Sequence, residues 1–115
     1  MKTVLIIDDD NMILGVFGQI LPRLGYEVVL KESPIDGVET FLADPDNFDL
    51  IITDQTMDEM SGDEVCQTVR EVKDVPVIKC TGNQPEGVEK FVLCKPFSIN
   101  EVEQLLKEAL GGSND

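Results

Sequence analysis

Short apolar runs alternate along this chain with longer segments in which apolar residues recur every three or four positions. The runs are rich in Val, Ile and Leu and end at polar residues, which is typical of strands buried on both faces of a parallel sheet. Five strands are predicted, at residues 4–7, 27–31, 49–53, 76–81 and 91–94. Because helical segments alternate with these strands, the pattern predicts an α/β fold with helices on both faces of the sheet.

The segments after the first two strands predict amphipathic helices. The first helix ends at Gly25 and has Pro22 in its last turn. Its apolar positions at helical spacing are Met12, Ile13, Val16, Phe17, Ile20, Leu21 and Leu24. The second helix begins at the capping residue Ser33, followed by Pro34, and stops before Pro45. Its predicted buried face consists of Ile35, Val38, Phe41 and Leu42.

Two further helices are predicted in the second half of the chain. The helix over residues 61–72 has three apolar positions at helical spacing, which are Val65, Val69 and Val72. The last helix begins at Ser98, which forms a capping box with Glu101, and it ends at a pair of glycines. Its predicted inward positions are Val102, Leu105, Leu106, Ala109 and Leu110.

The connection between the fourth and fifth strands is unusually short. Residues 82–90 are interrupted by Gly82, Pro85 and Gly87, whereas a parallel crossover usually needs about a dozen residues or more. The sequence therefore predicts a shortened or missing fourth helix, replaced by a loop or a single helical turn.

Chain length and composition indicate one domain, which we place at residues 1–111, followed by a flexible tail at 112–115. The hydrophobic fraction of 42% is enough to bury a core, and 9 basic against 23 acidic side chains give a net charge of -14. This charge repels phosphate backbones, so we expect no direct binding of nucleic acid and a partner with a basic or apolar surface.

Cysteine content and the start of the chain indicate a cytoplasmic protein. Cys66, Cys80 and Cys94 are odd in number and contain no CxxC pair, as expected of reduced, buried thiols. The residues before the first strand are too few for a signal peptide, and no apolar run is long enough to insert into a membrane. We therefore expect a cytoplasmic protein without membrane insertion.

Charged residues follow several of the predicted strands at the edge where parallel strands end. Asp8, Asp9 and Asp10 follow the first strand, Asp54 follows the third and Lys95 follows the fifth. Ligands gather at this edge in open α/β sheets. Because neighbouring carboxylates resist joint ionisation, such a cluster requires a cation among the acids. A single acid can be a helix N-cap, but three in succession exceed what one cap needs.

The chemistry of this cluster favours Mg²⁺ and an aspartyl nucleophile. Mg²⁺ prefers oxygen ligands and retains several waters, and the chain contains no histidine to serve as a metal ligand or base. The Asp54 carboxylate is already ionised, so it needs no base to attack phosphorus and form an acyl phosphate. Lys95 would screen the charge of the incoming group, and Thr81 would donate a hydrogen bond to a phosphoryl oxygen.

Four segments of the chain carry these residues: KTVLIIDDDN, LIITDQTMDEMSGDEV, PVIKCTG and CKPF. They resemble the signature blocks of bacterial response-regulator receiver domains, and the resemblance covers nearly the whole chain. It implies a flavodoxin-like, doubly wound five-stranded parallel sheet in the order 2-1-3-4-5. It also implies a regulator of a two-component system or phosphorelay that accepts a phosphoryl group and turns over no separate substrate.

The resemblance also implies roles for the charged residues. Asp8 and Asp9 would be the acidic pair that binds Mg²⁺, and Asp54 the phosphorylated aspartate and a further ligand. The backbone carbonyl of Thr56 would complete the protein ligands. Lys95 would be the phosphate-binding lysine.

Other positions follow from the same resemblance. Thr81 would be the switch hydroxyl, the Lys95–Pro96 bond would be cis, and Thr56 and Asn83 would tune access of water to the phosphoryl group. The donor would be a histidine kinase or a histidine phosphotransfer protein. Phosphorylation would then switch binding to a downstream protein of unknown identity.

The chain departs from the family pattern at two positions. Asp58 stands where the loop after the phosphoacceptor usually has proline, and Val92 stands where the family often has an aromatic residue, although Phe91 is adjacent. The added charge of Asp58 and the short fourth crossover leave a second hypothesis open. In that hypothesis the chain is an interaction module whose output does not depend on phosphorylation.

Two other classes fit less well. A flavin binder of flavodoxin type needs hydroxyls and glycines after the first strand, where this chain has Asp8 and Asp9. A phosphatase with an aspartyl nucleophile would have a second acid two positions after Asp54, where Thr56 stands.

Overall fold

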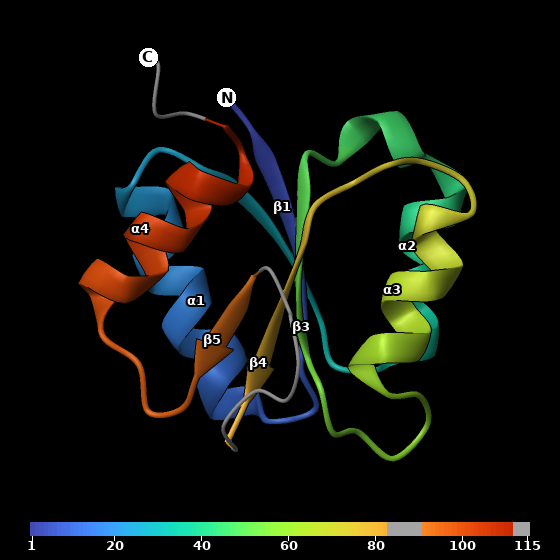
Figure 1. Cartoon of the computed structure of the whole chain (residues 1–115), viewed down its shortest axis with the longest axis horizontal. Coiled ribbons are helices and arrows are strands. Elements are labelled where there is room, and N and C mark those ends of the chain that lie inside the picture. Colours follow the sequence, from blue (N-terminus) through green and yellow to red (C-terminus); the bar gives the residue numbers. More distant parts are fainter. Residues whose placement is uncertain (83–90, 112–115) are drawn as a thin grey trace.

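A central parallel sheet organises the chain, as the computed structural model shows in Figure 1. The structure describes residues 1–82 and 91–111. The strands are β1 (Thr3–Ile7), β2 (Glu27–Lys31), β3 (Leu50–Asp54), β4 (Val77–Thr81) and β5 (Val92–Cys94). They lie in the order β2-β1-β3-β4-β5, and each neighbouring pair is parallel. The predicted order is confirmed, and β3, which ends at Asp54, is the central strand.

Helices cover both faces of this sheet. The helices are α1 (Asn11–Arg23), α2 (Pro34–Ala43), α3 (Gly62–Arg70) and α4 (Ile99–Ala109), with a 3-10 turn η1 (Pro45–Asn47) after α2. Figure 1 shows α1 and α4 on one face and α2 and α3 on the other. Among the helices that the structure describes, none has the length and hydropathy that a membrane crossing would require.

Two predictions lie largely outside the described residues. The shortened or missing fourth helix was expected within residues 82–90, of which 83–90 are not described, and the flexible tail at 112–115 is not described either. Both remain predictions. The ends of the crossover are nevertheless placed, because β4 and β5 pair in parallel with Lys79 opposite Val92 and Thr81 opposite Cys94.

The sheet divides the apolar interior into two cores, because successive side chains of a strand point to opposite faces. The α1/α4 core consists of Val4, Ile6, Leu14, Phe17, Leu21, Leu50, Ile52, Ile78, Cys80, Leu93, Val102 and Leu106. The α2/α3 core consists of Leu5, Ile7, Val38, Phe41, Phe48, Ile51, Met57, Val65, Val69, Val75 and Val77. β1 and β3 are buried along their whole length, as their continuous apolar runs predict.

Side-chain caps fix where the helices begin. Ser33 accepts a hydrogen bond from the Asp36 backbone N–H at the start of α2. Ser61 and Ser98 form complete capping boxes at α3 and α4. The predicted caps at Ser33 and Ser98 are therefore confirmed, and each satisfies backbone N–H groups that the helix leaves unpaired.

Not all the apolar positions at helical spacing face the core. Met12 is 79% exposed and Val16 is 41% exposed, because the buried side of α1 follows Leu14, Phe17 and Leu21. At about 100° per residue, Met12 and Val16 lie on the opposite side of that helix.

The same holds for the next two helices. Ile35 and Leu42 are 44% and 40% exposed, since they flank the buried side of α2 instead of forming it. Val72 is 54% exposed because α3 ends at Arg70, before Val72 can face the core.

Candidate functional site

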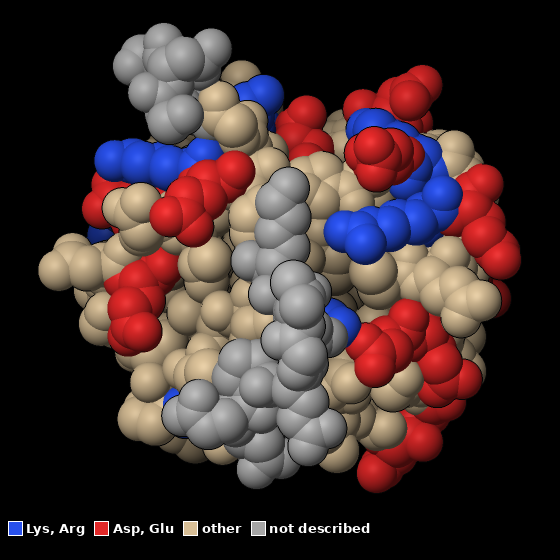
Figure 2. Space-filling model, in the orientation of Figure 1, with Lys and Arg blue, Asp and Glu red and all other residues tan. Residues whose placement is uncertain are grey.

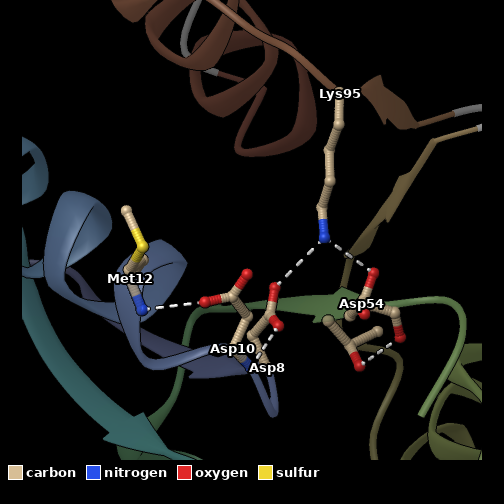
Figure 3. A network of polar contacts seen from close by, with 6 residues as sticks. Asp8, Asp10, Met12, Asp54 and Lys95 are labelled. Atoms are coloured by element: carbon tan, nitrogen blue, oxygen red, sulfur yellow. Dashed lines mark hydrogen bonds and ion pairs between the residues drawn. The ribbon is translucent and has the colours of Figure 1, made fainter.

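The predicted site residues meet at the carboxyl ends of the strands. Asp8 follows β1, Asp54 is the last residue of β3 and Lys95 follows β5. Figure 3 shows Lys95 reaching down between the two carboxylates from the segment that leads to α4. The parallel sheet thus brings together side chains that are far apart in the sequence.

Lys95 bridges the two buried acids. Its Nζ lies 3.1 Å from Oδ1 of Asp54 and 3.5 Å from Oδ2 of Asp8. The Asp8 residue is 1% exposed and Asp54 is 9% exposed. Burying two carboxylates this deeply is tolerable only with a positive charge in contact, which the ammonium group supplies.

Three carboxylates form a candidate metal centre. Asp8, Asp9 and Asp54 each offer an oxygen, and these oxygens lie within 4.8 Å of one another. Asp9 is exposed to solvent, so this side of the cluster is open to water. An all-oxygen set with an open, hydrated side suits Mg²⁺, which takes few protein ligands and keeps several waters.

The electrostatics of the cluster also favour a bound cation. Burial raises the pKa of Asp8, and the charge of Asp54 adds to this effect, whereas the Asp10 backbone N–H and Lys95 lower the pKa in part. Burial alone would lower the pKa of Lys95, but the hydrogen bond to Asp54 and the charge of Asp8 outweigh it and raise the pKa. The ammonium group of Lys95 therefore offsets only part of the cost of burying the Asp8 charge.

Asp10 has a separate role at the start of α1. Its carboxylate accepts a hydrogen bond of 2.9 Å from the Met12 backbone N–H, which makes Asp10 the N-cap of the helix. Its own N–H donates to Oδ1 of Asp8 at 2.9 Å. Figure 3 shows Asp10 turned toward the Met12 N–H. Of the three successive acids, one therefore caps a helix and the other two remain for the site.

The two threonines lie in the expected segments. Thr81 ends β4, and its carbonyl accepts the Lys95 backbone N–H at 2.8 Å, which places Thr81 beside Lys95 in the sheet. Thr56 is exposed in the loop after β3. Their roles as switch hydroxyl and metal ligand remain predictions, and Asn83 lies outside the described residues. The Lys95–Pro96 bond is cis, as expected.

Sequence reasoning missed a second polar group behind the site. Nε2 of Gln55 donates a hydrogen bond of 2.8 Å to Oδ2 of Asp63, and Nζ of Lys79 forms a short ion pair with Oδ1 of the same aspartate. We call Gln55, Asp63 and Lys79 the α3-side triad. The feature of the sequence that could have revealed this group is Lys79, a charged residue in the middle of a predicted buried strand. Its partner Asp63 could not be predicted from the spacing of residues along the sequence, because Asp63 lies on a different element, α3.

Comparison with known proteins gives one consistent result. The family model described as "Response regulator receiver domain" matches residues 4–107. The chain is 30% identical over 118 residues to the probable transcriptional regulator ycf27 of Cyanophora paradoxa, covering 95% of this chain and 48% of that protein. It is 27% identical over 121 residues to the polar-differentiation response regulator DivK of Brucella ovis, covering 96% of this chain and 97% of DivK.

The solved structures agree with the sequence matches. The chemotaxis protein CheY4 of Vibrio cholerae superposes with a TM-score of 0.86 at 26% identity, covering 96% of this chain and 99% of that one. The chain thus spans about half the length of ycf27 and almost all of DivK and CheY4.

Proposed function

Because the chain belongs to the response regulator receiver domain family, whose members are signalling modules and not substrate-turnover enzymes, we propose that it is a switch in which Asp54 accepts a phosphoryl group. The observation that supports this proposal most directly is the contact of Lys95 Nζ with Asp54 Oδ1 at 3.1 Å, beside the carboxylates of Asp8 and Asp9. A buried nucleophile, a cation donor and a metal-binding acid pair meet at one strand edge.

The transfer requires the side chains of the site, a divalent cation and a phosphoryl donor. An oxygen of the Asp54 carboxylate attacks phosphorus, the bond from phosphorus to the donor's leaving atom breaks, and an acyl phosphate forms. Asp8, Asp9, Asp54 and the Thr56 carbonyl would hold Mg²⁺, which would supply positive charge at the phosphoryl oxygens. Lys95 neutralises a further oxygen, and the Thr81 hydroxyl donates a hydrogen bond to the product.

The donor and the target are other proteins. The chain contains no histidine, so a phosphohistidine must come from a histidine kinase or a histidine phosphotransfer protein. Figure 2 shows acidic side chains on both sides of the face it draws, in line with the net charge of -14. A cytoplasmic protein partner with a basic or apolar surface fits this charge, whereas nucleic acid does not.

Intact-mass measurement tests the proposed function. The chain is incubated with acetyl phosphate and Mg²⁺, and the expected result is one added phosphoryl group that EDTA prevents. Asp54→Asn should abolish the gain in mass, whereas Asp46→Asn, which changes an exposed acid of η1, should leave it unchanged. No gain of mass in the wild-type chain, or full labelling of Asp54→Asn, would contradict the proposal.

One observation favours a second candidate function. Asp58 is exposed and lines the same acidic hollow as Asp9, together with Glu32 and Glu59. Because added negative charge opposes an incoming phosphoryl group, a receiver fold of this kind could bind its partner without phosphorylation. Equal recovery of the partner by wild type and by Asp54→Asn, with and without acetyl phosphate, would favour this second function.

A further inference from the structure

The α3-side triad, formed by Gln55, Asp63 and Lys79, joins the end of β3 to α3 and β4 next to the phosphoacceptor. Gln55 follows Asp54 in the chain, Asp63 lies in the first turn of α3 and Lys79 lies on β4. Asp63 accepts from both partners, through Oδ2 from Gln55 at 2.8 Å and through Oδ1 from Lys79. The mechanism proposed above uses none of these side chains.

In the triad a largely buried lysine meets an acid at the surface, because the Asp63 side chain is 60% exposed. The Lys79 side chain is 15% exposed, so its stem lies within the protein while its ammonium group reaches Asp63. The hydrogen bonds from Lys79 and then from Gln55 lower the pKa of Asp63, which therefore remains ionised well below neutral pH. The position of Asp63 in the first turn of a helix also favours its negative charge.

The backbone of Gln55 is held on two sides as well. Its N–H donates to the Cys80 carbonyl at 2.9 Å, and its carbonyl accepts from the Gly62 N–H at 2.9 Å. Gly62 packs so closely that an added Cβ would lie 2.7 Å from the Asp54 carbonyl oxygen and 2.6 Å from Oε1 of Gln55. The peptide that joins Asp54 to Gln55 is therefore clamped between β4 and the start of α3.

We infer that Gln55, Asp63 and Lys79 are positioning residues for the Asp54 nucleophile, an inference that rests on the proposed function. The Asp54 carboxylate must reach phosphorus while it contacts Lys95, and its orientation depends on the peptide that follows it. The triad holds the side chain of Gln55 against α3 and β4, so it limits rotation of that peptide. Reaction rates are sensitive to such alignment, and a shift of about 1 Å can cost up to about 100-fold.

The triad shares a strand with Thr81, the residue proposed as the switch hydroxyl. Lys79 and Thr81 are two positions apart on β4, so they lie on the same face of the strand.

Labelling kinetics test the inference in the full chain. The rate constant for acetyl phosphate labelling is measured by intact mass at saturating Mg²⁺ for wild type, Gln55→Met, Asp63→Asn and Asp63→Glu. Gln55→Met and Asp63→Asn should lower the rate constant about five- to tenfold, whereas Asp63→Glu, which keeps the charge, should recover most of it. Glu103→Gln is the matched control, because it removes an acid from the exposed Lys107–Glu103 ion pair of α4.

A second readout separates positioning from loss of structure or of metal. The Mg²⁺ concentration for half-maximal labelling should stay close to the wild-type value, since the substitutions leave Asp8, Asp9 and Asp54 unchanged. Circular dichroism checks that each variant is folded, and Lys79→Met, which keeps the aliphatic stem, tests the triad from β4 if Asp63→Asn does not fold.

Each outcome then decides between the two proposals. Wild-type rate constants in Gln55→Met and Asp63→Asn overturn the inference and leave the proposed function intact. A lowered rate that excess Mg²⁺ fully restores also overturns it, because the loss would then be one of metal affinity. Absence of labelling in the wild-type chain overturns the proposed function and this inference together.

Discussion

At the scale of single residues, Lys95 is the one described cation in contact with both buried acids of the site. It lies 3.1 Å from Asp54 and 3.5 Å from Asp8, and its side chain is 26% exposed. A metal ion bound to the same carboxylates would also neutralise their negative charge. The lysine should therefore contribute less to the stability of the fold when the metal is bound.

Replacing Lys95 should make stability depend on Mg²⁺. We expect Lys95→Met in EDTA to lower the free energy of unfolding by about 1–3 kcal/mol, because Asp8 and Asp54 lose their buried ionic partner. Millimolar Mg²⁺ should restore much of the loss. Urea unfolding followed by circular dichroism measures both values, and a loss of equal size with and without Mg²⁺ would show that the metal does not replace the lysine.

Cys80 should be chemically inert in the folded chain. It is buried beneath the site, and burial raises the pKa of its thiol to about 12. Only the thiolate is alkylated, so iodoacetamide at pH ~8.5, where an ordinary thiol is about half ionised, should leave Cys80 unmodified. Peptide mass spectrometry measures the extent, with urea-unfolded protein as the reactive control. Equally fast modification in both states would contradict the burial of this thiol.

Sequence reasoning reached part of the site because strand ends converge in a parallel sheet. Asp8, Asp54 and Lys95 each follow a recognisable apolar run, so their meeting could be predicted without knowing any distance. The contact of Asp63 with Gln55 and Lys79 depends on the rotation of α3 about its axis. A periodic pattern defines that rotation too loosely to pair individual polar side chains.

At the scale of elements, the close approach of α3 to the end of β3 depends on Gly62. A Cβ there would lie 2.7 Å from the Asp54 carbonyl oxygen and 2.9 Å from Cα of Gln55, both backbone neighbours that cannot simply rotate away. A glycine at the first position of α3 thus lets the helix begin directly against the site.

Gly62→Ala should therefore destabilise the protein. Because α3 must move away from the Asp54–Gln55 peptide, we expect a loss of about 1–3 kcal/mol in the free energy of unfolding. Gly15→Ala in α1 is the matched control, since nothing lies within 4 Å of its added Cβ. It should stabilise the chain by about 0.5–1 kcal/mol through its higher helix propensity. Urea titration of both variants checks the opposite signs.

Element boundaries were predicted well, and helix orientation less well. β2 begins and ends as expected, and α2 and α4 begin after their predicted serine caps, because caps and β-branched runs are local signals. Ile35 and Leu42 were misassigned to the buried face because the sequence offers more apolar residues than α2 can bury against one sheet face.

At the scale of the whole molecule, the excess of negative charge opposes the folded state. A net charge of -14 on 115 residues makes the folded chain repel itself. Raising NaCl from about 20 mM to about 500 mM should therefore increase the urea midpoint, since the Debye length falls well below the spacing of most surface acids. Chloride is preferred to sulfate, which also strengthens apolar burial. A lower midpoint at high salt would show that the exposed ion pairs outweigh the general repulsion.

The division of the interior by the sheet has a consequence for engineering. The α1/α4 core and the α2/α3 core share β-strands but draw on separate sets of side chains. Substitutions in different cores should affect stability additively when their side chains are distant, whereas those within one core should couple. The two halves could therefore be varied in separate combinatorial libraries and recombined afterwards, with Asp8, Asp54 and Lys95 kept constant at the edge they have in common.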